Sequence, residues 1–150
     1  MGLETLFFGL GIIVLLKIIY EDFNSRMIDS RSSSVMFGVV MSLYYSIGGV
    51  ISFFAYSVCF IIILMFFENK IKPRLKGIMY LGKGDVSVLL WVLPGLFIIN
   101  WIVGFFFVSC YLLINVIQTL VVKEKYAGTF SIFIAFVLSW MFNWFLQTIL

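Results

Sequence analysis

The chain contains no histidine, only two cysteines and two prolines, and few charged residues, which make up 11% of its 150 positions. Without histidine, His-ligated metal sites, Ser/His triads and Cys/His nucleophile pairs are excluded. Cys59 and Cys110 stand alone inside apolar runs and form no CxxC pair, so we interpret them as small core or lipid-facing residues. Any hydrolytic chemistry must therefore rest on carboxylates, and we expect neither a metal nor a cofactor.

The scarcity of charge is matched by an excess of apolar residues, which account for 63% of the chain. Soluble domains of this length are about 45–50% apolar and about 25% charged. A water-soluble fold has no means of covering so much apolar surface, so the sequence predicts an integral membrane protein whose surroundings are the lipid bilayer. The apolar runs are continuous rather than alternating, which favours an all-α fold over a barrel. The net charge of +3 gives no indication of nucleic-acid binding.

Two uncharged runs are too long to be single spans. The run 35–67 would be about 50 Å long as one helix, whereas a bilayer core is about 30 Å thick. Gly48-Gly49 marks a break near its middle. The run 86–122 is likewise divided, at Pro94-Gly95 and Asn100. We therefore predict a single domain over residues 1–150 with six transmembrane helices, at about 3–20, 33–48, 50–67, 85–97, 101–122 and 127–149.

The distribution of basic residues provides a test of this count. With six spans, the loops after the first, third and fifth lie on one side and hold nine of the ten lysines and arginines. The tenth, Lys17, lies near the same end of the first span and can extend to that surface. The opposite loops hold none. The positive-inside rule then places the basic loops in the cytoplasm and both termini outside, in the cytoplasmic membrane. A count of four spans would scatter these charges.

Two acids share one membrane depth under this topology. Asp22 ends the first helix and Asp85 begins the fourth, both on the cytoplasmic side. If the two helices are neighbours, the carboxyl groups meet, and a close like-charged pair retains one proton near neutral pH. The ionised acid can then activate a water while its protonated partner polarises a peptide carbonyl. This arrangement predicts peptide hydrolysis.

The residues around Asp85 fit that role but also have simpler explanations. Gly82 and Gly84 permit unusual backbone dihedrals and leave room for an extended peptide. Lys83 either faces lipid phosphates, which we favour, or biases the pair toward ionisation. Taken alone, Gly-x-Gly-Asp before a helix is most often a loop with an N-cap aspartate, and Asp22 is the hydrated end of a span. The coincidence of two acids at one surface favours function, because acids at membrane depth are costly.

Three further carboxylates compete with this pair. Glu21 follows Lys17 by one turn, which suits an ordinary helix ion pair. Asp29 and Glu68 lie further into polar loops, where solvation explains them. We therefore assign the chemistry to Asp22 and Asp85 alone.

Two motifs carry a family resemblance. Asp22-Phe23-Asn24-Ser25-Arg26-Met27-Ile28 and Gly82-Lys83-Gly84-Asp85 resemble those of the type IV prepilin peptidases and archaeal preflagellin peptidases, six-helix GxGD aspartyl proteases. The resemblance implies that Asp22 and Asp85 are catalytic and that Gly82 and Gly84 support the motif. Lys83, Arg26 and Glu21 are candidates for contacts with the substrate or the loop.

The resemblance also sets the expected substrate, a prepilin-like precursor with a short basic leader cut at the cytoplasmic face. The family often continues its first motif with Pro-Asn, where this chain has Asp29-Ser30, which leaves the turn of that loop and the substrate register open. The chain lacks the cysteine-rich insertion of the larger bacterial enzymes, so we expect cleavage without N-methylation. The sequence specifies neither the particular pilin nor the oligomeric state.

Other classes of function remain as alternatives. A presenilin or signal-peptide-peptidase type of protease shares the GxGD acid, although such proteins are usually longer. A small transporter or assembly subunit would use the two acids to bind a cation or a proton, although transporters tend to contain internal repeats and we find none. A degenerate, inactive family member is the third alternative, and the intact acids count against it.

Overall fold

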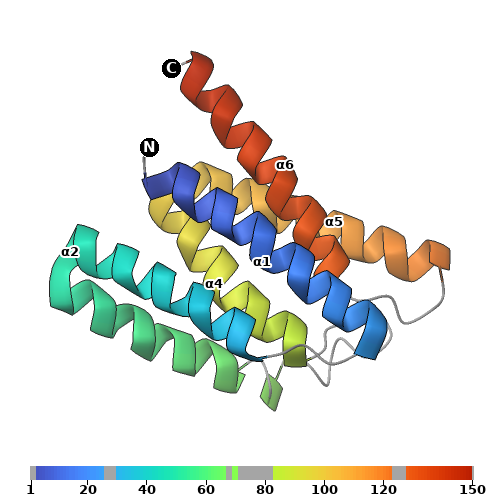
Figure 1. Ribbon diagram of the computed structural model, residues 1–150, viewed down its shortest axis with the longest axis horizontal. Helices are drawn as coiled ribbons and strands as arrows, with labels where there is room; N and C mark the ends of the chain where they lie inside the picture. Colours follow the sequence, from blue (N-terminus) through green and yellow to red (C-terminus); the bar gives the residue numbers. More distant parts are fainter. Residues whose placement is uncertain (1–2, 26–29, 67–68, 71–82, 123–127, 150) are drawn as a thin grey trace.

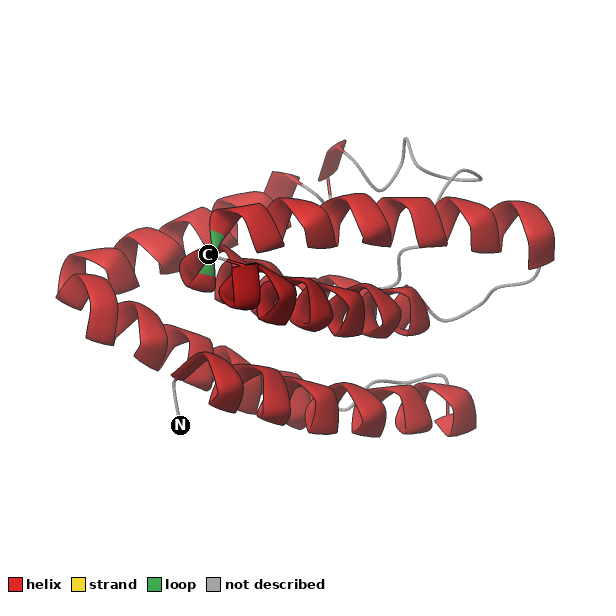
Figure 2. Cartoon of the chain, turned by 90° about the horizontal axis from the view of Figure 1, so that it is seen from above, coloured by secondary structure: helices red, strands yellow, loops and turns green. Residues whose placement is uncertain are grey.

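The computed structural model describes residues 3–25, 30–66, 69–70, 83–122 and 128–149. Within these residues the chain is helical except at Asn100 and contains no strand, which confirms the predicted all-α class (Figure 2). Five helices make up the fold (Figure 1): α1 (Leu3–Ser25), α2 (Ser30–Phe66), α4 (Lys83–Ile99), α5 (Trp101–Val122) and α6 (Gly128–Ile149).

Helix α2 is two helical arms joined at a kink. Gly49 has φ of 67° and ψ of −160°, a conformation outside the helical region. Glycine enters this region without a side-chain clash, whereas other residues are strained there. Figure 1 shows the second arm folding back alongside the first. The break predicted at Gly48-Gly49 is therefore confirmed.

The second predicted break lies at Asn100 alone. Helix α4 continues through Pro94 and ends at Ile99, two residues beyond its predicted end. Asn100 then caps α5, because its Oδ1 accepts a hydrogen bond of 2.9 Å from the backbone N–H of Ile102. The break predicted at Pro94-Gly95 and Asn100 thus falls at Asn100, and Pro94-Gly95 lies inside α4, as it does within the predicted bounds of 85–97.

Helix α4 is the centre of the fold and packs against α1, α2, α5 and α6. Its Trp91 is fully buried and meets Phe7 of α1 and Phe136 of α6 edge-on, with ring centroids 6.4 and 6.3 Å away. The Trp91 indole N–H also donates a 3.2 Å hydrogen bond to Ser33 Oγ of α2. A buried indole donor usually finds such a partner, and here it fixes the first arm of α2 against α4.

Three helical segments of the described residues are long and apolar enough to cross a membrane: Arg31–Cys59, Trp101–Gln118 and Gly128–Ile149. A shorter apolar segment covers Gly84–Ile99. Large apolar side chains lie on the outside of the bundle, and Ile51 is 83% exposed. An exterior of this kind is compatible with contact with lipid, as the composition predicts.

Candidate active site

Asp22 contacts the first turn of α6. Helices α1 and α6 pack against each other in opposite directions, which brings the end of α1 to the start of α6 (Figure 1). The Thr129 hydroxyl donates a 2.8 Å hydrogen bond to Asp22 Oδ2. Thr129 is fully buried and Asp22 half-buried. Because the donor is held inside the bundle, the Asp22 carboxyl group has a fixed orientation.

Asp85 contacts the same turn of α6 from the other side. It lies in the first turn of α4 and is only 6% exposed. A Cβ added to Gly128 would lie 2.6 Å from Asp85 Oδ2 and 2.7 Å from its Cγ. Real Cβ atoms do not approach other atoms so closely, so the carboxyl group fits here because residue 128 has no side chain.

The two predicted acids therefore contact consecutive residues, Gly128 and Thr129, and their helices α1 and α4 also pack directly against each other. The N-terminus of α6 carries partial positive charge from its unpaired N–H groups. It faces both carboxyl groups, so negative charge on either one is favoured there. The two carboxyl groups therefore lie against the same turn of α6, and that of Asp85 is buried.

The structure describes some of the other predicted site residues and neither Asp29 nor Glu68, the two loop acids that were set aside in favour of Asp22 and Asp85. Gly84 is half-buried, and its carbonyl accepts a 2.7 Å hydrogen bond from Ser87 Oγ, which closes the first turn of α4. Glu21 pairs with Lys17 at 3.5 Å, one turn apart, as predicted. Lys83 begins α4, and the structure describes only its backbone. Gly82, Arg26, Asp29 and Glu68 lie outside the described residues.

A tyrosine that sequence analysis did not select also belongs to this region. Tyr111 of α5 is 5% exposed and interacts electrostatically with Asp85. Its ring lies nearly parallel to that of Phe107, with an interplanar angle of 2° and centroids 6.1 Å apart. Among the described residues, no hydrogen-bond partner lies within reach of its hydroxyl oxygen. Tyrosine is common in apolar helices, and no spacing in the sequence links this one to either acid.

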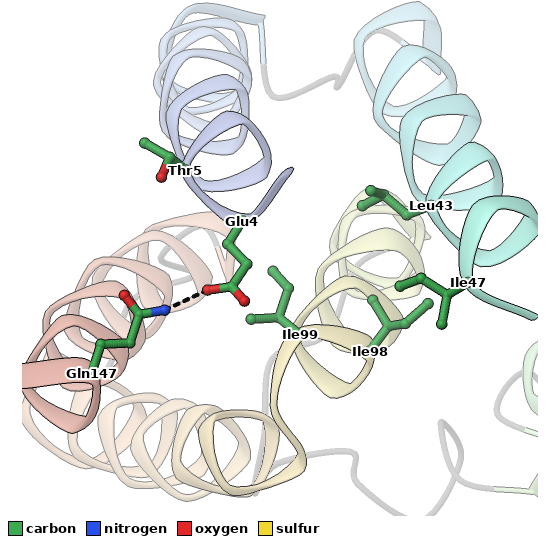
Figure 3. A pocket seen from close by; sticks show the side chains of 7 residues that line it. All are labelled: Glu4, Thr5, Leu43, Ile47, Ile98, Ile99 and Gln147. Carbon is green, nitrogen blue, oxygen red and sulfur yellow. Dashed lines mark hydrogen bonds between the residues drawn. The ribbon is translucent and has the colours of Figure 1, made fainter. Parts of the chain in front are cut away.

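A second polar site lies at the opposite end of the bundle. A cavity of about 470 Å³ opens there between α1, α2, α4 and α6 (Figure 3). Glu4 Oε2 accepts hydrogen bonds of 2.6 Å from Gln147 Nε2 and 3.5 Å from Asn143 Nδ2. The rest of the lining is mainly apolar, from Leu43, Ile47, Ile98 and Ile99, with Thr5.

Aromatic side chains occupy the level between this cavity and the two aspartates. On α4, Trp91 lies between Asp85 and the cavity-lining Ile98 and Ile99. Phe7 and Phe136 occupy the corresponding levels of α1 and α6, and all three aromatic residues are fully buried. The two ends of the bundle are therefore separated by a packed apolar layer.

Comparison with protein-family models, with curated proteins and with solved structures gives no match for this chain.

Proposed function

We propose that this chain is a membrane-embedded aspartyl endopeptidase that removes the short basic leader of prepilin-like precursors, without N-methylation. The observation that carries the proposal is the convergence of Asp22 and Asp85 on consecutive residues of α6. The acids come from helices far apart in the sequence. Thr129 donates a hydrogen bond to Asp22, and Gly128 leaves room for the carboxyl group of Asp85. The GxGD resemblance supplies the substrate class.

The two acids differ in burial, which suggests which of them acts as the general base and which as the general acid. Asp22 is half-buried and accepts a hydroxyl hydrogen bond, which suits the ionised carboxylate that removes a proton from water. Asp85 is almost fully buried, and burial disfavours a charged carboxylate. Asp85 then donates its proton to the carbonyl oxygen as water adds to the carbon. When the C–N bond breaks, Asp22 returns its proton to the leaving amine, and Asp85 takes back a proton from one hydroxyl of the gem-diol as the new carboxylic acid forms.

The proposal includes a six-span topology, with the two arms of α2 counted separately. The six helical segments are then about 25 to 35 Å long at 1.5 Å per residue, against a hydrocarbon core of about 30 Å. The N-terminal end of α1 and the C-terminal end of α6 adjoin through the bond between Glu4 and Gln147. Both termini would face outside, and Asp22 and Asp85 would lie at the cytoplasmic surface, where a basic leader meets its membrane helix.

The packed aromatic layer favours this proposal over transport. A carrier that used Asp22 and Asp85 to move a cation or proton would need a route to the other surface. Phe7, Trp91 and Phe136 fill the centre of the bundle with mutual edge-on contacts.

The test is co-expression of the chain with a tagged prepilin, with leader removal followed by gel shift. Wild type is compared with Asp22→Asn, Asp85→Asn and Glu21→Gln. The asparagine variants keep the shape of the side chain and remove its acid chemistry, so both should fail to cleave. Glu21→Gln is the matched control, because Glu21 precedes Asp22 in the chain and pairs with Lys17. Cleavage by either asparagine variant would contradict the two-acid assignment. Intact leaders with wild type would refute the peptidase proposal and favour ion-flux assays.

A further inference from the structure

The Tyr111 hydroxyl is a buried donor without an acceptor among the described residues, although its side chain is 95% removed from solvent. Buried polar groups are nearly always hydrogen-bonded, because an unsatisfied one costs about 1–3 kcal/mol. Phe107 packs parallel to the ring and holds it in place. A donor that has no acceptor in the described part of the chain is available to a ligand.

The position of Tyr111 indicates which ligand. Helix α5 packs against both α4 and α6, the helices that carry Asp85 and its contact residue Gly128. Tyr111 interacts electrostatically with Asp85. Its hydroxyl can donate but carries no charge, so it suits a polar group that gains negative charge during a reaction. A carbonyl oxygen under attack by water is such a group.

We propose that Tyr111 is a further catalytic residue, whose hydroxyl donates a hydrogen bond to the scissile carbonyl oxygen of the substrate as water adds to the carbonyl carbon. This inference rests on the proposed peptidase function. Tyr111 transfers no proton: the proton on the carbonyl oxygen comes from Asp85, and the Tyr111 bond stabilises the oxygen while its charge develops. The substrate supplies the acceptor that the resting protein lacks.

A catalytic role for Tyr111 predicts a different result from a purely structural role. Tyr111→Phe removes a hydroxyl that has no hydrogen bond to any residue the structure describes, so the melting temperature should stay the same or rise. The loss of one donor to a developing oxyanion typically lowers kcat about 10²–10³-fold. We expect kcat for leader cleavage to fall by about 10²-fold, with KM nearly unchanged, because the bond strengthens in the transition state.

Tyr56→Phe is the matched control. Tyr56 is 8% exposed, similar to Tyr111, but its hydroxyl donates to the backbone carbonyl of Leu90. The same substitution there removes an existing hydrogen bond, so it should lower the melting temperature and leave kcat of the folded protein unchanged. Tyr111→Phe is thus expected to lower kcat without lowering the melting temperature, and Tyr56→Phe to lower the melting temperature without lowering kcat.

The experiment measures kcat and KM with a purified prepilin, and thermal unfolding, for wild type and both variants. A lower kcat with an undiminished melting temperature for Tyr111→Phe supports the inference. Retention of kcat within twofold would overturn it. So would a fall in melting temperature like that of Tyr56→Phe, which would mean that the Tyr111 hydroxyl is bonded at rest. Failure of wild type to cleave would instead refute the proposed function, so the two failures are distinguishable.

Discussion

Replacement of Thr129 by valine tests the most specific contact in the candidate site. Valine has the shape of threonine, with a methyl group in place of the hydroxyl, and residue 129 is fully buried. The change removes the 2.8 Å bond to Asp22 Oδ2 and leaves the packing of the first turn of α6 nearly intact. If Thr129 orients the Asp22 carboxyl group for water activation, the catalytic rate should fall.

The size of the effect follows from the exposure of the acceptor. A hydrogen bond to a charged group contributes about 1.5–3 kcal/mol. Asp22 is half-buried, so water can replace part of the lost bond, and the lower end of that range applies. At about 1.36 kcal/mol per factor of ten, we expect Thr129→Val to lower kcat by roughly tenfold. KM should change little, because Asp22 is assigned to the attacking water rather than to binding.

Thr129→Ser is the rescue variant for this prediction. It restores the hydroxyl and removes only a methyl group, so it should recover most of the wild-type kcat for leader cleavage. Thermal unfolding of each variant checks that activity is compared between folded proteins. Wild-type kcat in Thr129→Val would refute the reasoning, and so would a serine variant no more active than the valine variant, since either result would separate the hydroxyl from catalysis.

Three other substitutions test separate parts of the structure. Gly128→Ala should lower the rate of cleavage severely, because the added Cβ would lie 2.6 Å from Asp85 Oδ2. The unfolding temperature should change little, because alanine favours the helix. An unchanged cleavage rate would contradict the contact between Gly128 and Asp85. Gly49→Ala should destabilise the protein by about 1–3 kcal/mol, measured by thermal unfolding, because φ at this kink is 67°. Gln147→Leu should lower the unfolding temperature slightly and leave cleavage intact, because it removes a bond to Glu4 at the end remote from the aspartates; lost cleavage would show that the two ends are coupled.

The break in the run 35–67 could be placed from the sequence at Gly48-Gly49, whereas the break in the run 86–122 could be placed only between Pro94 and Asn100. The run 35–67 is too long for the membrane, and Gly48-Gly49 is its only pair of helix-weakening residues. Pro94-Gly95 gave a similar signal but lies inside α4. Membrane helices tolerate proline where neighbouring groups satisfy the freed backbone. Pro94 has no N–H to donate to the Leu90 carbonyl, and here the Tyr56 hydroxyl donates to that carbonyl instead. That compensation is a tertiary contact, which local sequence does not reveal.

The two acids were identifiable because a carboxylate in an apolar chain is costly and therefore conspicuous. Their neighbours carry no such signal. Gly128 and Thr129 look like the ordinary small and polar start of a helix, and Tyr111 resembles the other aromatic residues of the apolar runs. The bond between Thr129 and Asp22 joins residues 107 positions apart. Only the antiparallel packing of α1 and α6 brings them together.

The start of α6 favours negative charge on the acids that contact it. Asp85 lies in the first turn of α4, and both acids contact the first turn of α6. Each helix N-terminus favours a nearby anion by about 0.3–1 kcal/mol at exposed sites and by up to about 2 kcal/mol where partly buried. The α6 N-terminus and the Thr129 hydroxyl together offset part of the cost of a carboxylate on Asp22, whereas the α4 N-terminus acts on Asp85. The start of α6, which in the sequence is only the beginning of a last apolar segment, is therefore the part of the bundle on which the proposed chemistry most depends.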